Sequence, residues 1–111
     1  MVIGDNNVIS EFVTIQRPLA QGEATVVGSG NIIMAHVHIG HDAVIGANTE
    51  LCVGAIIGGY ATIKNEAKVK MGSIIRNRKS VGESAIVGMG SVVTKDINQG
   101  ATVMGVPEKE R

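Results

Sequence analysis

Aliphatic residues recur at every sixth position along almost the whole chain. Stepping by six from Ile3 reaches sixteen positions, and fifteen of them are aliphatic. They are Ile3, Ile9, Ile15, Val27, Ile33, Ile39, Ile45, Leu51, Ile57, Ile63, Val69, Ile75, Val81, Val87 and Val93, with Gln21 as the exception. Slim residues such as Ala43, Ala55 and Ser73 stand two positions earlier. Both repeated positions are therefore restricted in size.

The period of six excludes the commonest secondary structures. An amphipathic α-helix needs apolar spacing near 3.6 residues, and an antiparallel strand needs strict alternation. A short strand plus a turn fits six residues, and three such units close a triangular coil whose parallel sheets stack residues eighteen apart. The sequence predicts an all-β fold, a parallel β-helix of about five triangular coils over residues 1–97. Residues 98–111 leave the repeat, so we expect a tail that caps the last coil.

Glycine often follows the repeated aliphatic residue. We expect these positions to turn with positive φ or to have no room for a side chain. They are Gly4, Gly22, Gly28, Gly40, Gly46, Gly58, Gly82 and Gly88.

Composition and charge narrow the class of protein. Aromatic residues make up only 2% of the 111-residue chain, so one thin aliphatic core is expected. The ten basic and ten acidic residues cancel, which argues against a nucleic-acid partner. The single cysteine, Cys52, and the lack of an apolar run of about 18 residues predict a cytoplasmic protein without a membrane span.

One segment interrupts the repeat, over residues 16–26. Pro18 breaks strand pairing there, and Gln21 replaces the aliphatic residue. The segment preserves the phase of six, so it is either two degenerate hexads or a loop that leaves the β-helix. Such a loop could contact substrate.

All three histidines, His36, His38 and His41, fall within six residues. Histidine is the side chain best suited to proton transfer near neutral pH. His41 is followed by Asp42 and lies at a corner of a coil, whereas His36 belongs to the preceding corner. Surface histidines without a role are the alternative.

The segments VIGDNNVISEFVTIQR and AQGEATVVGSGNIIMAHVHIGHDAVIGAN carry a specific resemblance. Over residues 2–63 the chain resembles the bacterial UDP-N-acetylglucosamine acyltransferases of lipid A synthesis, within the hexapeptide acyltransferases. The resemblance implies a left-handed β-helix, a homotrimer with sites between subunits, and acyl transfer from a phosphopantetheine thioester to a sugar or sugar nucleotide.

The resemblance also implies roles for individual residues. His41 would be the general base, and the amide of Gly59 would polarise the thioester carbonyl. Asp42 would orient the His41 imidazole or remain an exposed residue without a partner. We expect substrate contacts from His38, Gln16, Gln21 and Asn77. The donor would be acyl-CoA or an acyl-carrier protein, and no bound cofactor or metal is expected.

The segment VGESAIVGMGSVVTKDINQGATVMGVPEK resembles the last coil and tail of acetyl-CoA-dependent sugar and serine acetyltransferases. That tail usually ends GxPAK and lines the pantetheine channel, which implies donor contacts from Gly105, Pro107 and Lys109. Glu108 departs from the usual alanine. Capping of the last coil is an equally good account.

Arg76 and Arg78 could bind the phosphates of a donor, or an acidic carrier protein. Alternatively, basic residues of this region form solvated pairs with charges eighteen residues away, as in Arg78 with Asp96 and Lys68 with Glu50.

Departures from the family pattern leave two other functions open. Gln16 and Tyr60 stand where the family has histidines, and Pro18 and Leu19 replace a Gly-Thr pair. A non-catalytic scaffold derived from an acyltransferase would fit such losses. His36 and His41 also reproduce the spacing of two zinc-binding histidines in γ-class carbonic anhydrases, although the third histidine is missing.

Overall fold

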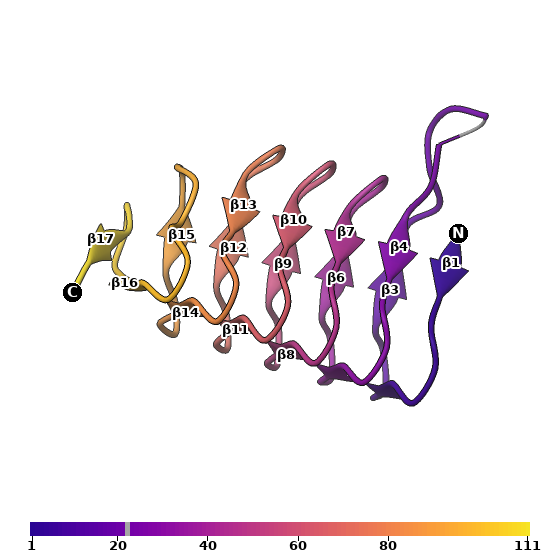
Figure 1. The fold of residues 1–111 in the computed structure, drawn as a ribbon, viewed down its shortest axis with the longest axis horizontal. Helices are drawn as coiled ribbons and strands as arrows, with labels where there is room; N and C mark the ends of the chain where they lie inside the picture. The colour runs from indigo at the N-terminus through magenta and orange to yellow at the C-terminus, as the bar shows by residue number, and fades with distance from the viewer. Residues whose placement is uncertain (22) are drawn as a thin grey trace.

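The computed structural model describes residues 1–21 and 23–111. These residues form seventeen short strands and no helix. The strands follow one another around a prism, and successive coils lie side by side along its long axis (Figure 1). The molecule measures 37 × 26 × 22 Å. A parallel β-helix, as the period of six predicts, is therefore confirmed.

Three parallel sheets form the sides of the prism, and consecutive strands pass from one sheet to the next. The first sheet contains β1 (Val2–Ile3), β4 (Val26–Val27), β7 (Val44–Ile45), β10 (Thr62–Ile63) and β13 (Ser80–Val81). The second contains β2 (Val8–Ile9), β5 (Ile32–Ile33), β8 (Glu50–Leu51), β11 (Lys68–Val69), β14 (Ile86–Val87), β16 (Thr102–Met104) and β17 (Lys109–Glu110). The third contains β3 (Thr14–Ile15), β6 (His38–Ile39), β9 (Ile56–Ile57), β12 (Ile74–Ile75) and β15 (Val92–Val93).

The strand register explains the interruption in the repeat. Ile45 pairs with Ile63, eighteen residues on, whereas Ile3 pairs with Val27, twenty-four residues on. The six additional residues leave the prism as a loop between β3 and β4 (Figure 1). Of the two expected alternatives the loop is correct, and it ends before Val26, which already belongs to β4.

The repeated aliphatic residues form the core. Every ladder position from Val27 to Val93 is buried, and the slim residues two positions earlier, such as Ala43 and Ala61, also have no exposed surface. Ile3 and Ile9 remain more than 40% exposed because they lie in the first coil. The interior is a stack of thin aliphatic layers, which accounts for the near absence of aromatic residues.

Within residues 1–21 and 23–111, positive φ does not occur at the glycines where the sequence predicts it. Positive φ occurs three residues after the ladder position, at residues such as Asn48, Tyr60 and Gly54, rather than at the glycine that follows it directly. That glycine is needed for close approach: a Cβ on Gly28 would lie 2.4 Å from the carbonyl oxygen of Gly46 in the next coil. Gly22 lies outside the described residues.

The C-terminal segment continues the second sheet before reversing. β16 pairs in parallel with β14, and β17 pairs antiparallel with β16. Among residues 1–21 and 23–111 there is no helix of the length and apolarity needed to cross a bilayer.

Candidate active site

The predicted catalytic residues lie along one edge of the prism, where the chain passes from the third sheet to the first. Each coil places a turn there, and the β3–β4 loop stands on the same edge (Figure 1). His41 and Asp42 occupy one turn, Gly59 and Tyr60 the next, and Asn77 and Arg78 the one after. The stacking is tight, because the amide N–H of Tyr60 donates to the His41 carbonyl oxygen at 2.9 Å and that of Arg78 to the Gly59 carbonyl oxygen at 3.0 Å.

The side chains of His41 and Asp42 lie within ion-pair distance of each other at this edge. Nδ1 of His41 lies 3.1 Å from Oδ2 of Asp42, and their side chains are 25% and 2% exposed. A buried carboxylate at this distance favours a proton on Nδ1, which leaves the lone pair of Nε2 as the acceptor. Asp42 thus has a partner, unlike the exposed alternative considered from the sequence.

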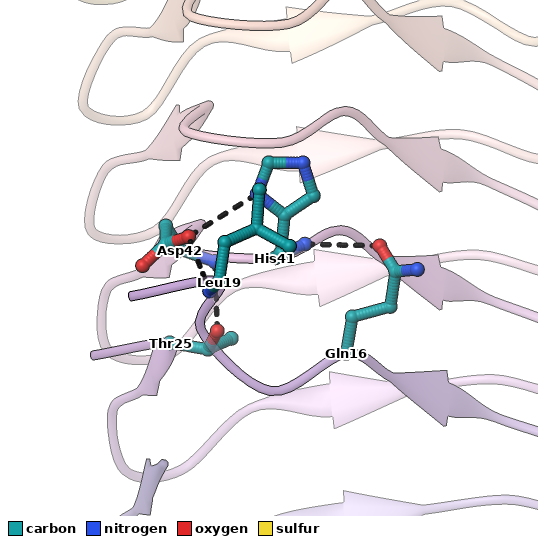
Figure 2. A network of polar contacts seen from close by, with 5 residues as sticks. All are labelled: Gln16, Leu19, Thr25, His41 and Asp42. Atoms are coloured by element: carbon teal, nitrogen blue, oxygen red, sulfur yellow. Dashed lines mark hydrogen bonds and ion pairs between the residues drawn. The ribbon is translucent and has the colours of Figure 1, made fainter. Parts of the chain in front are cut away.

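The β3–β4 loop holds this pair from outside. The backbone N–H of His41 donates to the side-chain oxygen of Gln16 at 3.1 Å, and that of Asp42 donates to the Thr25 hydroxyl at 2.8 Å. Oδ2 of Asp42 also accepts from the backbone N–H of Leu19 at 3.2 Å (Figure 2). We call these contacts the loop clamp. Gln16, expected as a substrate contact, uses its amide oxygen here to hold the His41 backbone.

Gly59 leaves room for the His41 ring. A Cβ on Gly59 would lie 2.6 Å from Nε2 of His41 and 2.7 Å from Cε1, closer than atoms can approach. Gly59 is buried, and its amide N–H takes no part in the hydrogen bonds of residues 1–21 and 23–111. A residue with an unpaired backbone donor therefore packs against the basic nitrogen of His41, and an oxyanion is stabilised by donors of this kind.

Tyr60 and Arg78 continue the stack beyond His41. The Tyr60 ring meets the His41 ring edge-on, with centroids 5.3 Å apart, and the Arg78 guanidinium carbon lies 4.4 Å above the Tyr60 centroid. Burial, followed by the charges of Asp42 and Glu23, raises the pKa of the Tyr60 phenol, and Arg78 opposes the shift. The expected pairs of Arg78 with Asp96 and Lys68 with Glu50 are not formed. Arg78 stacks on Tyr60, and Glu50 lies 3.5 Å from Lys70.

An open cavity of about 640 Å³ lies next to this stack on the outer face of the third sheet. Ile56, Ile74 and Val92 form its apolar floor. Arg76, Asn77, Arg78 and Lys79 line it as well. His38 stacks directly under Ile56, in the same outward column, and its Nδ1 lies 2.7 Å from the Thr14 hydroxyl. Of the predicted ligands, Asn77, Arg76 and Arg78 line this cavity, and His38 borders its floor.

His36 lies apart from this group, at the other end of β6. Its ring stacks on Phe12 with centroids 5.1 Å apart. Within the described part of the chain, no three His, Cys, Asp or Glu side chains are grouped so that they could hold a metal ion. The paired zinc-type spacing of His36 and His41 therefore does not bring these residues together within one chain.

The predicted donor residues of the tail lie at the far end of the prism. The Gly105 carbonyl oxygen accepts from the Val92 amide at 3.0 Å, a cis peptide bond precedes Pro107, and Lys109 begins β17. The Glu108 carboxylate accepts from the backbone N–H groups of Thr94 and Lys95, at 3.0 and 2.9 Å. Glu108 thus pairs the two backbone N–H groups that follow β15. This contact gives a structural reason for a glutamate where the similar tails have an alanine.

Gln21, expected as a substrate contact, is exposed, and no hydrogen bond within residues 1–21 and 23–111 joins it to His41 or Asp42. Thr25 and Leu19, by contrast, contact Asp42 and were not expected to. From the sequence, Tyr60 is interpreted as the replacement of a family histidine. Its position eighteen residues after Asp42 also indicates that the two residues stack.

No model of a known protein family matches the chain. Over 44 residues it is 59% identical to acyl-[acyl-carrier-protein]–UDP-N-acetylglucosamine O-acyltransferase of Pseudomonas putida, a match that covers 39% of this chain and 17% of that protein. The UDP-N-acetylglucosamine acyltransferase structure from Arabidopsis is 31% identical, with a TM-score of 0.97 over 98% of this chain and 38% of the other. PerB of Caulobacter crescentus, solved with CoA and GDP-perosamine, is 25% identical, with a TM-score of 0.77 over 96% of this chain and 54% of that one.

These comparisons confirm the resemblance drawn from the motifs. The chain is similar to UDP-N-acetylglucosamine acyltransferases in a segment of its sequence and in almost all of its fold. It spans less than half the length of the Arabidopsis structure and matches 17% of the Pseudomonas relative. Those neighbours are left-handed β-helices, and a coil of the opposite hand would not superimpose with a TM-score of 0.97. The expected left-handed winding is therefore confirmed.

Proposed function

We propose that this chain carries the site of an acyltransferase that moves an acyl group from a phosphopantetheine thioester to a hydroxyl or amine of a sugar nucleotide. One observation carries the proposal: Nε2 of His41 lies against Gly59, whose amide N–H is unpaired among residues 1–21 and 23–111, while Oδ2 of Asp42 lies 3.1 Å from Nδ1. A base and an oxyanion donor side by side are what acyl transfer to a neutral nucleophile needs.

The chemistry follows from these groups. Nε2 of His41 takes the proton of the acceptor hydroxyl or amine as its oxygen or nitrogen attacks the thioester carbonyl. The Gly59 amide donates to the oxyanion of the tetrahedral intermediate. The C–S bond then breaks, and the thiolate takes the proton from the imidazolium, which restores the starting state. Asp42 stabilises the imidazolium meanwhile.

The residues that line the cavity beside the Tyr60–Arg78 stack favour the binding of an anionic substrate. Arg76 and Arg78 offer guanidinium groups that suit phosphate oxygens, and Asn77 adds an amide. A sugar nucleotide and a phosphopantetheine donor both carry phosphate. The similar Pseudomonas and Arabidopsis enzymes are named for UDP-N-acetylglucosamine, which makes this acceptor, and a place in lipid A synthesis, the first candidate.

The donor is acyl-CoA or an acyl-carrier protein. The similar Pseudomonas enzyme takes its name from acyl-carrier protein, and the PerB structure contains CoA. Gly105, Pro107 and Lys109 remain our candidates for contacts to the pantetheine arm. An apolar hollow of about 520 Å³, where Met71, Met89 and Met104 surround Cys52, would accommodate a hydrocarbon chain.

A homotrimer in the cytoplasm belongs to the same proposal. The outer face of the third sheet exposes Ile56 and Ile74 beside the proposed site, at 41% and 40%. A neighbouring subunit on this face would cover apolar surface and enclose the cavity. Cys52 is a free thiol, as expected in a reducing compartment.

The test compares wild-type protein with His41→Ala. Thiol release is measured from acyl-CoA and acyl-carrier protein thioesters of several chain lengths, with UDP-N-acetylglucosamine and with an amino-sugar nucleotide. Loss of the general base should lower transfer at least about a hundredfold. His36→Ala is the matched control. The His36 ring stacks on Phe12, apart from the His41 group, so its removal should leave the rate unchanged.

Two outcomes would contradict the proposal. Equal background rates in wild type and His41→Ala would identify a non-catalytic scaffold. Stoichiometric zinc in the purified protein, lost together with activity in His36→Ala, would indicate the carbonic-anhydrase-like alternative.

A further inference from the structure

Asp42 leaves one oxygen without a partner. Its Oδ2 accepts from Leu19 and lies against His41, but Oδ1 is buried and has no hydrogen-bond partner among residues 1–21 and 23–111. A buried carboxylate oxygen without a donor has lost its hydration without compensation. The side chain therefore needs a donor to remain in this orientation.

Tyr60 is the hydroxyl donor that the fold brings to this carboxylate. Asp42 and Tyr60 occupy equivalent turn positions in successive coils, both with φ near 60°, and their turns are joined by the hydrogen bond from Tyr60 N–H to the His41 carbonyl oxygen. Burial raises the pKa of the Tyr60 phenol, and the negative charge of the nearby Asp42 carboxylate raises it further. The phenol therefore keeps its proton throughout the neutral range.

The Tyr60 ring is fixed on both sides. Its face lies under the Arg78 guanidinium, and the His41 ring meets it at an interplanar angle of 86°. Edge-on aromatic contacts and cation–π contacts both stabilise such an arrangement of the ring. A phenol held by two neighbours can direct its hydroxyl with little further loss of entropy.

We propose that Tyr60 is a positioning residue for the reaction: its hydroxyl donates to the Asp42 carboxylate and keeps that carboxylate turned toward Nδ1 of His41. The proposal rests on the proposed function of His41 as general base. It gives Tyr60 a role of its own in this chain. Tyr60 acts through Asp42 and not on the substrate.

The consequence appears at the imidazole of His41. In Tyr60→Phe the ring contacts remain, but the carboxylate has no hydroxyl donor, so it turns away from Nδ1. The contact between Oδ2 of Asp42 and Nδ1 of His41, which fixes the orientation and tautomer of the ring, is then lost.

The first experiment is an NMR comparison of the imidazole resonances in wild type and in Tyr60→Phe. We expect the Nδ1–H proton of His41 to give a downfield resonance in wild type that broadens or moves upfield in the variant, while the resonances of His36 and His38 stay unchanged as internal references. Glu23→Gln is the control, since it removes a neighbouring carboxylate and leaves the hydroxyl. An unchanged Nδ1–H resonance in Tyr60→Phe would overturn the proposal, as would an equal change in Glu23→Gln.

The second experiment measures the rate of transfer. Tyr60→Phe should lower kcat about tenfold and leave KM within about twofold. A loss of rate with an unchanged Nδ1–H resonance of His41 would mean that Tyr60 only supports packing, and would overturn the proposal. Because the NMR comparison needs no substrate, absence of transfer in every variant would refute the proposed function while leaving the test of Tyr60 intact.

Discussion

Gly59 is the residue on which the site geometry depends most directly. Its missing side chain is the space that the His41 imidazole occupies, and its amide is the proposed oxyanion donor. A single residue matters here because the two coils touch at this turn, which leaves no space for an added methyl group on Gly59.

Gly59→Ala should displace the His41 ring and lower transfer at least about tenfold, with little change in the fold. Gly72→Ala is the matched control. Its Cβ would meet open space, but its φ of 69° makes alanine strained, so stability should fall by about 1 kcal/mol without loss of rate. Transfer assays and denaturant unfolding of both variants check this, and an active Gly59→Ala would contradict it.

Cys52 should behave as an inert thiol. Burial, followed by the Glu50 carboxylate, raises its pKa, so the thiol is the dominant form at neutral pH. Alkylation by iodoacetamide should therefore be slow at pH 7 and accelerate only above the usual thiol range. Glu50→Gln should shift that profile to lower pH. Cys52→Ala should retain transfer activity, and its inactivity would point to a covalent mechanism instead.

At the scale of elements, the turns are held together by buried side-chain amides as well as by strands. Asn31 is fully buried at a corner between the first and second sheets. Its side-chain oxygen accepts from the backbone N–H and the hydroxyl of Thr49, at 2.8 and 2.7 Å, and its amide nitrogen donates to the Gly46 carbonyl oxygen. One side chain thus joins two successive coils.

Asn31→Val should destabilise the protein by about 3 kcal/mol, because it leaves the buried N–H and hydroxyl of Thr49 and the half-buried carbonyl of Gly46 unpaired. Asn65→Ala is the control. Its oxygen accepts from the Ala47 amide at 2.9 Å in an exposed position, so water can replace it and the loss should stay below about 1 kcal/mol. Equal losses in denaturant unfolding would show that burial does not decide the cost.

The tail offers a second test at this scale. Glu108→Ala should free the amides of Thr94 and Lys95 at the edge of β15 and lower the free energy of unfolding by about 1–2 kcal/mol. Hydrogen exchange should accelerate at these two amides. Glu110→Ala, which removes an exposed carboxylate of β17, should change neither quantity. Unchanged exchange in Glu108→Ala would contradict its role as a cap.

The whole molecule is a narrow prism with apolar residues on its outer faces. Ile56 and Ile74 stack on the third sheet, and the cavity beside them is open to solvent in a single chain. A prism of 11.5 kDa has little interior of its own, so association is the expected way to gain burial.

Light scattering of the purified chain should therefore give about three times the monomer mass of 11.5 kDa. Ile74→Glu should reduce the mass to that of the monomer, since it places a charge on the covered face. The control is Lys64→Glu, an exposed charge reversal after the first sheet, which should leave the mass unchanged. A wild-type monomer would contradict both the trimer and a site shared between subunits.

The period of six by itself determined the parallel β-helix, because it repeats a size restriction that only stacked thin layers satisfy. It also placed His41 under Gly59, since residues eighteen apart must stack. Tertiary structure alone decided the loop clamp. The contacts of Gln16 with His41, and of Leu19 and Thr25 with Asp42, depend on how an extra six residues fold back, and no repeat encodes that path. The same holds for Asp42, whose burial follows from the loop that covers it.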